Sequence, residues 1–117
     1  SRVFNFAIQL RHRYRDRGLL GENVDADLHD MIFQAQTLGA KLAGALNRLA
    51  YDPQPDAGLI VASLKRALQY VNDGVSAAER VAEKNLLDDA EVDEYKRELL
   101  AVREEMLSLM QRFRQQT

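Results

Sequence analysis

Four arginines and a tyrosine near the start of the chain have the chemistry of a nucleic-acid site. They are Arg11, Arg13, Tyr14, Arg15 and Arg17. Guanidinium groups attract phosphates and an aromatic ring stacks on bases, so the group predicts a patch for nucleic acid or for an acidic protein. The alternative is structural: arginines at the end of a short helix complement its dipole and meet acidic groups on the fourth helix. We favour the structural interpretation, because salt-bridged arginines leave little potential to attract phosphate.

The charge of the chain is divided unevenly between its first helix and the rest. Residues 1–17 contain five arginines against Asp16 alone, which gives +4. The remaining hundred residues hold eleven basic and seventeen acidic groups, which gives −6, so the net charge of the 117 residues is −2. This balance argues against a general nucleic-acid or membrane binder and leaves a local patch as the form that binding would take.

Residues that would support catalysis or metal binding are scarce. The chain has no cysteine, no Glu-x-x-His pair and no glycine-rich phosphate loop. His12 and His29 are expected to be solvated surface side chains, and the acidic run from Asp88 to Glu94 is explained by capping at the start of a helix. We therefore expect a protein that is not an enzyme, with no catalytic residue, no metal, no cofactor and no small-molecule substrate.

Helical spacing of apolar residues predicts the elements that position these groups. Four helices are expected at about 1–17, 25–51, 56–85 and 89–116, separated by glycine-containing and proline-containing loops. Either Asp25 or Asp27 and either Asp88 or Asp89 would cap the helices that follow them. Four helices with short connections predict an all-α, antiparallel up-down-up-down four-helix bundle, one domain over residues 1–117.

Each predicted helix has an apolar row that steps three and four residues along the chain and is expected to form the core. A flanking row of Ile32, Gly39 and Leu46 widens the second. Gly39 and Gly44 each cost about 1 kcal/mol in a helix interior, so each calls for a packing reason or marks a softer stretch. The predicted core rows are Val3, Ala7, Leu10 and Tyr14; Leu28, Met31, Ala35, Leu38, Leu42, Ala45 and Leu49; Ile60, Leu64, Ala67 or Leu68, Val71, Val75, Ala78 and Ala82; and Val92, Tyr95, Leu99, Val102, Met106, Leu109 and Phe113.

Apolar residues outside the core rows predict contact with a second subunit. They extend beyond the inner rows of the first, second and fourth helices, which is more than one bundle interior uses. The candidate interface residues are Phe4, Ile8, Phe33, Leu100, Leu107 and Met110. We therefore expect a homo-oligomer.

No stretch of the sequence approaches the roughly 20 apolar residues of a membrane span. The segment Val3 to Leu10 is interrupted by Asn5 and Gln9 and lacks a small-residue cleavage site, so it does not have the pattern of a signal peptide. A cytoplasmic protein without membrane contact is the expectation.

The junction of the last two predicted helices resembles a known family. Residues 82–95 read AEKNLLDDAEVDEY and are followed by KRELL, which gives a lysine-containing turn, an acidic cap and a tyrosine-containing closing helix. This order resembles the four-helix-bundle proteins encoded in intervening sequences of bacterial 23S ribosomal RNA genes, and the similar retroelement accessory variability determinants. The resemblance, best over residues 63–112, implies an antiparallel bundle that forms a homo-oligomer, with pentameric rings favoured, and nucleic-acid association.

The leading functional hypothesis is a non-enzymatic, self-associating cytosolic bundle that forms a ring-like homo-oligomer and acts as a scaffold or adaptor. The alternative hypothesis is a nucleic-acid or reverse-transcriptase accessory module that uses the basic first helix.

Overall fold

Helices account for most of the chain that the computed structural model describes, which is residues 2–54 and 56–115. They are α1 (Arg2–Asp16), α2 (Ala26–Tyr51), α3 (Ala57–Glu83) and α4 (Asp89–Arg114), and no strand forms within the described ranges. The all-α, four-helix prediction is confirmed, with bounds that differ from the expected ones by one or two residues. Ser1 and Gln116, predicted as helix ends, and Pro55, predicted in a loop, lie outside the described residues.

Aspartates start three of the helices. The Asp25 carboxylate accepts hydrogen bonds from the backbone N–H groups of Asp27 and Leu28, at 2.8 and 3.1 Å. Asp56 accepts from the N–H of Leu59 at 3.1 Å. Asp88 accepts from the N–H of Glu91 at 2.8 Å, and the Glu91 carboxylate accepts from the N–H of Asp88. Asp25 and Asp88, rather than Asp27 and Asp89, are thus the caps that satisfy the free amides of the first turn.

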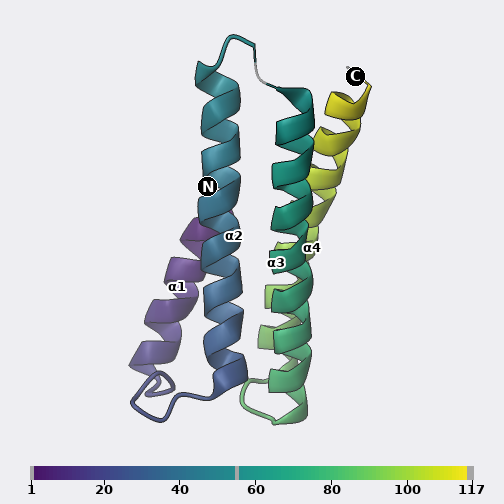
Figure 1. Cartoon of the computed structure of the whole chain (residues 1–117). Helices are drawn as coiled ribbons and strands as arrows, with labels where there is room; N and C mark the ends of the chain where they lie inside the picture. Colours follow the sequence, from purple (N-terminus) through teal and green to yellow (C-terminus); the bar gives the residue numbers. More distant parts are fainter. Residues whose placement is uncertain (1, 55, 116–117) are drawn as a thin grey trace.

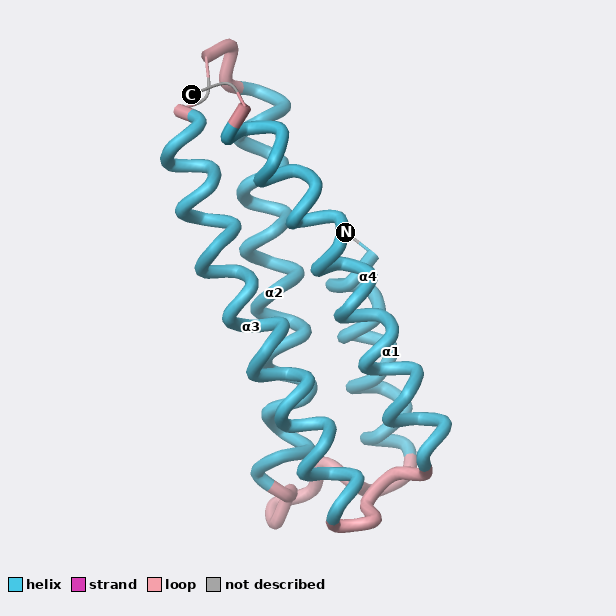
Figure 2. The backbone as a smooth tube through the Cα atoms, turned by 90° about the vertical axis from the view of Figure 1, so that its right-hand side faces the viewer, coloured by secondary structure: helices cyan, strands magenta, loops and turns pink. Residues whose placement is uncertain are grey.

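The helices form an elongated bundle of 47 × 23 × 19 Å. Its loops lie at alternating ends, so successive helices run in opposite directions (Figure 1). α1 packs on α2, α2 on α3 and α3 on α4, while α1 and α4 have the slightest contact of these pairs. α1 has 15 residues against 26 or 27 in the others and accompanies them along one end of the bundle only (Figure 2). At the other end three helices pack without a fourth beside them.

The predicted core rows are mostly buried, with differences at their edges. On α3 Gly74 and Val81 are buried although they were not predicted for the core, whereas Val75 and Ala82, which were predicted for it, are half-buried. On α4 Met110 is buried in place of Leu109. On α2 the inner row is buried through Ala45, and Leu49 is half-buried. These shifts follow from the helical period of 3.6 residues, which moves a strict three-four row slowly around the helix.

Leu46 was predicted to flank the core, and this prediction is wrong: its side chain is 44% exposed. Gly39 lies two turns earlier on the same side of α2, and a Cβ there would stand 2.7 Å from the Cα and Cβ of Phe4. α1 therefore covers α2 at Gly39, but the described part of α1 stops near this level (Figure 1). Leu46 lies beyond that cover and faces solvent.

One buried hydrogen bond ties α4 to α2 through the centre of the bundle. The Tyr95 hydroxyl donates to the backbone carbonyl of Met31 at 2.6 Å. Gly74 makes room for it, because a Cβ there would lie 2.7 Å from both Tyr95 Oη and Leu99 Cδ2. Burial raises the pKa of Tyr95 above its usual value, so the hydroxyl remains a donor.

None of the helices in the described ranges is long and apolar enough to cross a membrane.

Candidate interaction surface

The arginines near the end of α1 point to two sides of the helix and do not form one patch. Arg13 Nη1 lies 3.6 Å from Glu94 Oε1, and Arg17 forms an ion pair with Glu91. Arg15 Nη2 lies 2.6 Å from Nδ1 of His12, one turn earlier. The structural interpretation, in which these arginines meet acidic groups on the fourth helix, is therefore confirmed for Arg13 and Arg17.

Tyr14 does not serve as a stacking surface, and that part of the nucleic-acid prediction is wrong. Its side chain has no solvent exposure and belongs to the core. Its hydroxyl oxygen is buried and has no hydrogen-bond partner among the described residues. Burial, and then the negative charge of Glu91, raises its pKa to about 12. Nucleic-acid binding through Arg11 and Arg15, the two arginines not paired to α4, stays a prediction.

Ion pairs join the helices at the end of the bundle that α1 covers. α1 is tied to α4 by Arg13 and Arg17 and by Arg2, which donates to Glu98 at 3.1 Å. α2 is tied to α3 where Lys84 Nζ lies 2.8 Å from Asp25 and 2.7 Å from Asp27. Five of the eighteen acidic residues therefore form ion pairs between helices at this end of the bundle. No group of three acidic or histidine side chains in the described ranges could hold a metal ion.

The six candidate interface residues lie in three environments. Phe33 on α2 and Leu100 on α4 are exposed, by 50% and 42%. Phe4, Ile8 and Leu107 are half-buried, and Phe4 packs over Gly39 within the chain. Met110 is only 3% exposed and belongs to the core, so its prediction as an interface residue is wrong. Phe33 and Leu100 are thus the two candidates that present a large apolar surface to solvent.

Phe33 belongs to a longer row on the outer face of α2, of which the predicted interface included Phe33 alone. The row steps four, three, four, three and four residues, and such spacing places its members on one side of a helix. All are exposed except Thr37, which is half-buried, and Tyr51 is 82% exposed. We call these residues the outer row: Phe33, Thr37, Ala40, Gly44, Asn47 and Tyr51.

The outer row is free of charge in a protein whose other surfaces are not. Between Met31 and Tyr51 the sequence has two charged residues, Lys41 and Arg48. Both line a hollow toward α3, where Arg48 Nη2 lies 3.4 Å from the Ser63 hydroxyl. The 26 residues of α4, by contrast, include twelve charged ones. The near absence of charged residues between Met31 and Tyr51 is therefore the sequence feature that could have predicted this surface, and the spacing of core residues does not reveal it.

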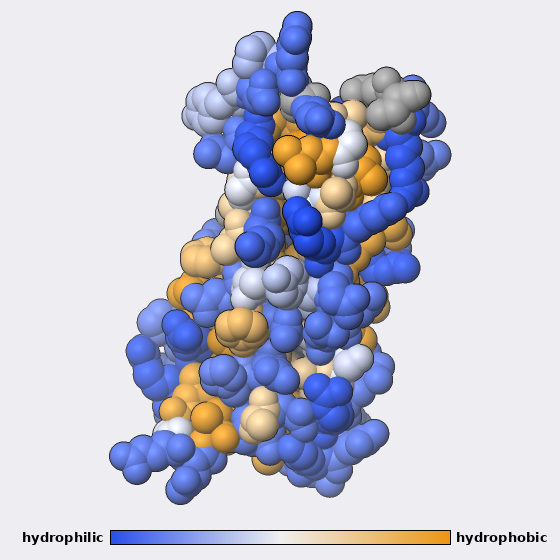
Figure 3. Space-filling view, in the orientation of Figure 1, coloured by the Kyte–Doolittle hydropathy of each residue, from blue (hydrophilic) through white to orange (hydrophobic). Residues whose placement is uncertain are grey.

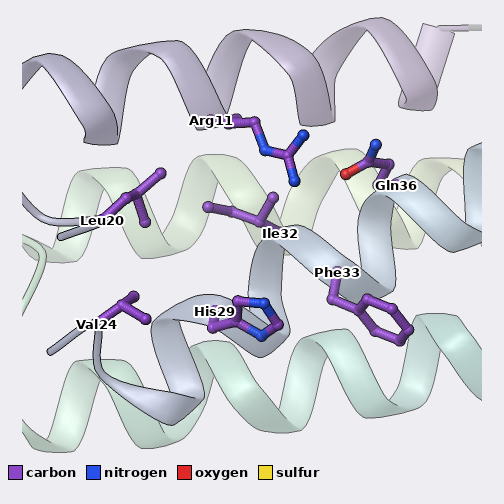
Figure 4. Close-up of a pocket in the computed structure, with 7 residues that line it drawn as sticks. All are labelled: Arg11, Leu20, Val24, His29, Ile32, Phe33 and Gln36. Atoms are coloured by element: carbon purple, nitrogen blue, oxygen red, sulfur yellow. The ribbon is translucent and has the colours of Figure 1, made fainter. Parts of the chain in front are cut away.

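A hollow lies at one end of the outer row, between α1, the loop after it and α2 (Figure 4). Its volume is about 220 Å³. The His29 ring stacks on Phe33, with 6.3 Å between ring centroids and an angle of 15°. The Arg11 side chain reaches from α1 across the hollow toward Gln36 (Figure 4). The lining residues are Arg11, Leu20, Val24, His29, Ile32, Phe33 and Gln36.

Gly44 has no packing reason among the described residues. A Cβ at Gly39 or Gly74 would collide with a neighbouring helix, whereas a Cβ at Gly44 would meet nothing within 4 Å. Glycine lowers helix stability by about 1 kcal/mol relative to alanine. Gly44, near the middle of the outer row, therefore lowers the stability of α2, and no contact among the described residues compensates for this loss.

Apolar groups on the face shown in Figure 3 lie in separate patches among hydrophilic side chains. One patch lies near the top, over the gap between α2 and α3 (Figure 3).

Comparison of the chain with protein-family models, with curated protein sequences and with solved structures finds no match in any of the three. The function therefore has to be inferred from the geometry of the chain itself.

Proposed function

We propose that the chain is a non-enzymatic, self-associating helical bundle that acts as a scaffold or adaptor. The observation that carries the proposal is the exposed, uncharged outer row of α2, with a large aromatic side chain at each end. Exposed aromatic groups on a charge-poor helix face are typical of protein interfaces, in which aromatic residues are enriched and charged ones depleted. The ring-like assembly and the pentamer implied by the family resemblance stay predictions that a mass measurement can test.

Association is tested by light scattering of the 13.3 kDa chain from submicromolar to high micromolar concentration. We expect the mass to rise with concentration to that of an oligomer. Phe33→Glu would bury a charge in the interface and is expected to weaken association by more than about tenfold. A monomeric mass of the unaltered chain at every concentration would contradict the proposal.

Leu100→Glu is the matched control, because Leu100 has a similar exposure but lies on α4. We expect this variant to associate like the unaltered chain. If Leu100→Glu dissociates the oligomer and Phe33→Glu does not, self-association holds but its surface is on α4. The absorbance ratio at 260 and 280 nm of the same samples would reveal bound nucleic acid, since the chain has four tyrosines and no tryptophan.

A further inference from the structure

The chemical types of the side chains in the outer row follow the same order whether the row is taken from its N-terminal or its C-terminal end. Its two ends are aromatic, Phe33 and Tyr51; the next positions inward are uncharged and polar, Thr37 and Asn47; the central positions are small, Ala40 and Gly44. Each pair is placed symmetrically about residue 42. A surface with this order is chemically complementary to a copy of itself turned end over end, which is the requirement for a two-fold interface.

Charge at the ends of the row favours the same antiparallel pairing. Arg11 lies beside Phe33 in the hollow and forms no ion pair with the described residues. Asp52 follows Tyr51; it accepts a hydrogen bond from the N–H of Gln54 at 3.0 Å and likewise has no ion pair in the described ranges. Turning a second copy end over end brings its Asp52, and the negative end of its α2 dipole, level with Arg11 of the first copy. A parallel pairing would instead place like ends together.

The centre of the row permits the close approach that such a contact needs. Ala40 and Gly44 have at most a methyl group, and the space over Gly44 is empty in the single chain. Small residues at a helix crossing let two backbones come near each other, and side chains on the flanking turns then interdigitate. A second α2 above Gly44 would supply the packing reason that the monomer lacks.

The hollow beside Phe33 is matched in size to a protruding side chain. Its volume of about 220 Å³ is below the roughly 300–1,000 Å³ of pockets that enclose whole ligands. Its floor is apolar at Leu20, Val24 and Ile32, while Arg11 and Gln36 add polar groups at the side. A tyrosine ring with a terminal hydroxyl has the same combination of apolar body and polar end.

We infer that α2 packs antiparallel on α2 of a second copy across a two-fold axis near Leu42. Tyr51 of each chain enters the hollow beside Phe33 of the other, and Arg11 of each chain pairs with Asp52 of the other. This inference rests on the proposed self-association and specifies its surface and register. It favours a closed dimer as the basic unit, because a surface that binds itself leaves no second copy of the patch to extend a ring.

The absence of cysteine from the chain makes the register testable by disulfide trapping. Thr37→Cys and Asn47→Cys are made separately, with one chain carrying a size tag, and the two are mixed and oxidised. In the antiparallel register residue 37 lies opposite residue 47 of the second copy. Residues 37 of both copies would lie about 15 Å apart along the helix, too far for a disulfide. We expect the mixed 37–47 disulfide to exceed either homodisulfide by more than about tenfold.

The outcomes separate a failure of the register from a failure of self-association. An excess of the 37–37 and 47–47 disulfides would overturn the antiparallel register and support a parallel contact. An oligomeric mass with no disulfide at either position, or a mass of five subunits, would place the contact on another surface and leave self-association intact. A monomeric mass throughout would overturn both.

Helicity of each cysteine variant is checked by circular dichroism before oxidation. If either variant unfolds, Phe33→Cys mixed with Tyr51→Cys at high micromolar concentration tests the same register at the ends of the row, because the mixed pair keeps one contact between Tyr51 and Phe33. The corresponding homodisulfides would there require residues about 27 Å apart to meet.

Discussion

α2 has two faces with nearly the same spacing and very different surroundings. Its inner row runs from Leu28 to Ala45, in steps of three and four, and is buried against the other helices. Its outer row, from Phe33 to Tyr51, has the same heptad-like steps and faces solvent. In a helix with a single partner side, the opposite face is normally charged. The lack of charge on the outer row is therefore the difference on which we base the proposal of a second partner for α2.

The largest expected effect on the free energy of unfolding comes from replacing one residue of the inner row by alanine, in comparison with one residue of the outer row. Leu38→Ala on the inner row removes a fully buried side chain and is expected to lower the free energy of unfolding by about 2–5 kcal/mol. Phe33→Ala on the outer row is expected to change it by no more than about 1 kcal/mol in dilute solution. Urea unfolding followed by circular dichroism at submicromolar concentration measures both.

The dependence of unfolding on protein concentration should be changed by Phe33→Ala and not by Leu38→Ala. A partner that binds only folded chains raises the unfolding midpoint with concentration. We expect Leu38→Ala to keep that concentration dependence and Phe33→Ala to lose it. Equal effects of the two variants on the stability of the dilute chain would contradict the assignment of the faces.

The next largest effect is expected from replacing Gly39 and Gly44 of α2 by alanine, which should change the free energy of unfolding in opposite directions. A methyl group at Gly39 would press on the backbone of Phe4, so Gly39→Ala is expected to cost about 1–3 kcal/mol of overpacking, more than the helix propensity of alanine returns. Gly44→Ala meets nothing and should raise the free energy of unfolding of the dilute chain by about 0.5–1 kcal/mol.

The same Gly44→Ala substitution should weaken association while it stabilises the monomer, because it fills space that a second α2 needs. Thermal unfolding at low concentration and scattering mass at high concentration measure the two effects separately. A Gly44→Ala chain that is more stable and also associates more tightly would show that no helix approaches Gly44.

The fold could be predicted from the sequence more fully than the surface. Capping aspartates, loop prolines and core rows are local patterns, and they placed four helices within one or two residues of their bounds. The errors at Leu46, Val75 and Met110 arose because burial depends on which neighbour lies beside each turn, and spacing along one helix does not contain that information. Leu46 in particular is exposed because α1 does not accompany α2 along its whole length.

The candidate site was predicted only in part for a related reason. The sequence contains the arginines near the end of α1, but it does not give their directions around the helix, and these directions, two toward α4 and one into the hollow, determine which of them are available. The outer row is composed largely of Ala, Gly, Thr and Asn, which no hydrophobicity pattern emphasises. Its significance depends on an absence of charge and on the empty space over Gly44, and the second of these is visible only in three dimensions.

Replacement of the buried tyrosines Tyr14 and Tyr95 by phenylalanine is expected to change the free energy of unfolding by a smaller amount. Tyr95→Phe removes the hydrogen bond to the Met31 carbonyl and is expected to cost about 1 kcal/mol. Tyr14→Phe removes a buried hydroxyl without a partner among the described residues and should be neutral or stabilising. Denaturant unfolding of the two variants at neutral pH makes the comparison, and a larger loss for Tyr14→Phe would contradict it.

Tyr14 also makes stability sensitive to alkaline pH. Its pKa is raised from 10.0 to about 12, so the folded state holds the proton more tightly than the unfolded state does. Below pH 10 the hydroxyl is protonated in both states, and the stability of the fold decreases as the pH rises from 10 to about 12, because the unfolded state loses this proton first. Tyr14→Phe should therefore unfold less readily than the unaltered chain within that interval.

The smallest expected effect concerns the carboxylates at the start of α2. Hydrogen bonding to Lys84 lowers the pKa values of Asp25 and Asp27, and Arg80 adds to the effect on Asp27. Carboxylates with a lowered pKa stabilise the fold above their usual value of 3.8, and that contribution is lost as the pH falls below it. The effect is small because the partner side chains Lys84 and Arg80 are 44% and 47% exposed, so solvent screens these ion pairs.

Asp27→Asn should therefore show a shallower loss of stability below about pH 4 than the unaltered chain, while the two behave alike in their pH dependence from pH 5 to 7. The matched control is Asp93→Asn on α4, an exposed carboxylate without an ion pair among the described residues. Thermal unfolding midpoints across the acid range give the measurement. Asp27 belongs to the end of α2 that is tied to α3, so Asp27→Asn should leave the scattering mass at neutral pH unchanged. A variant that dissociated there would mean that the contact between copies extends to the first turn of α2, beyond the outer row.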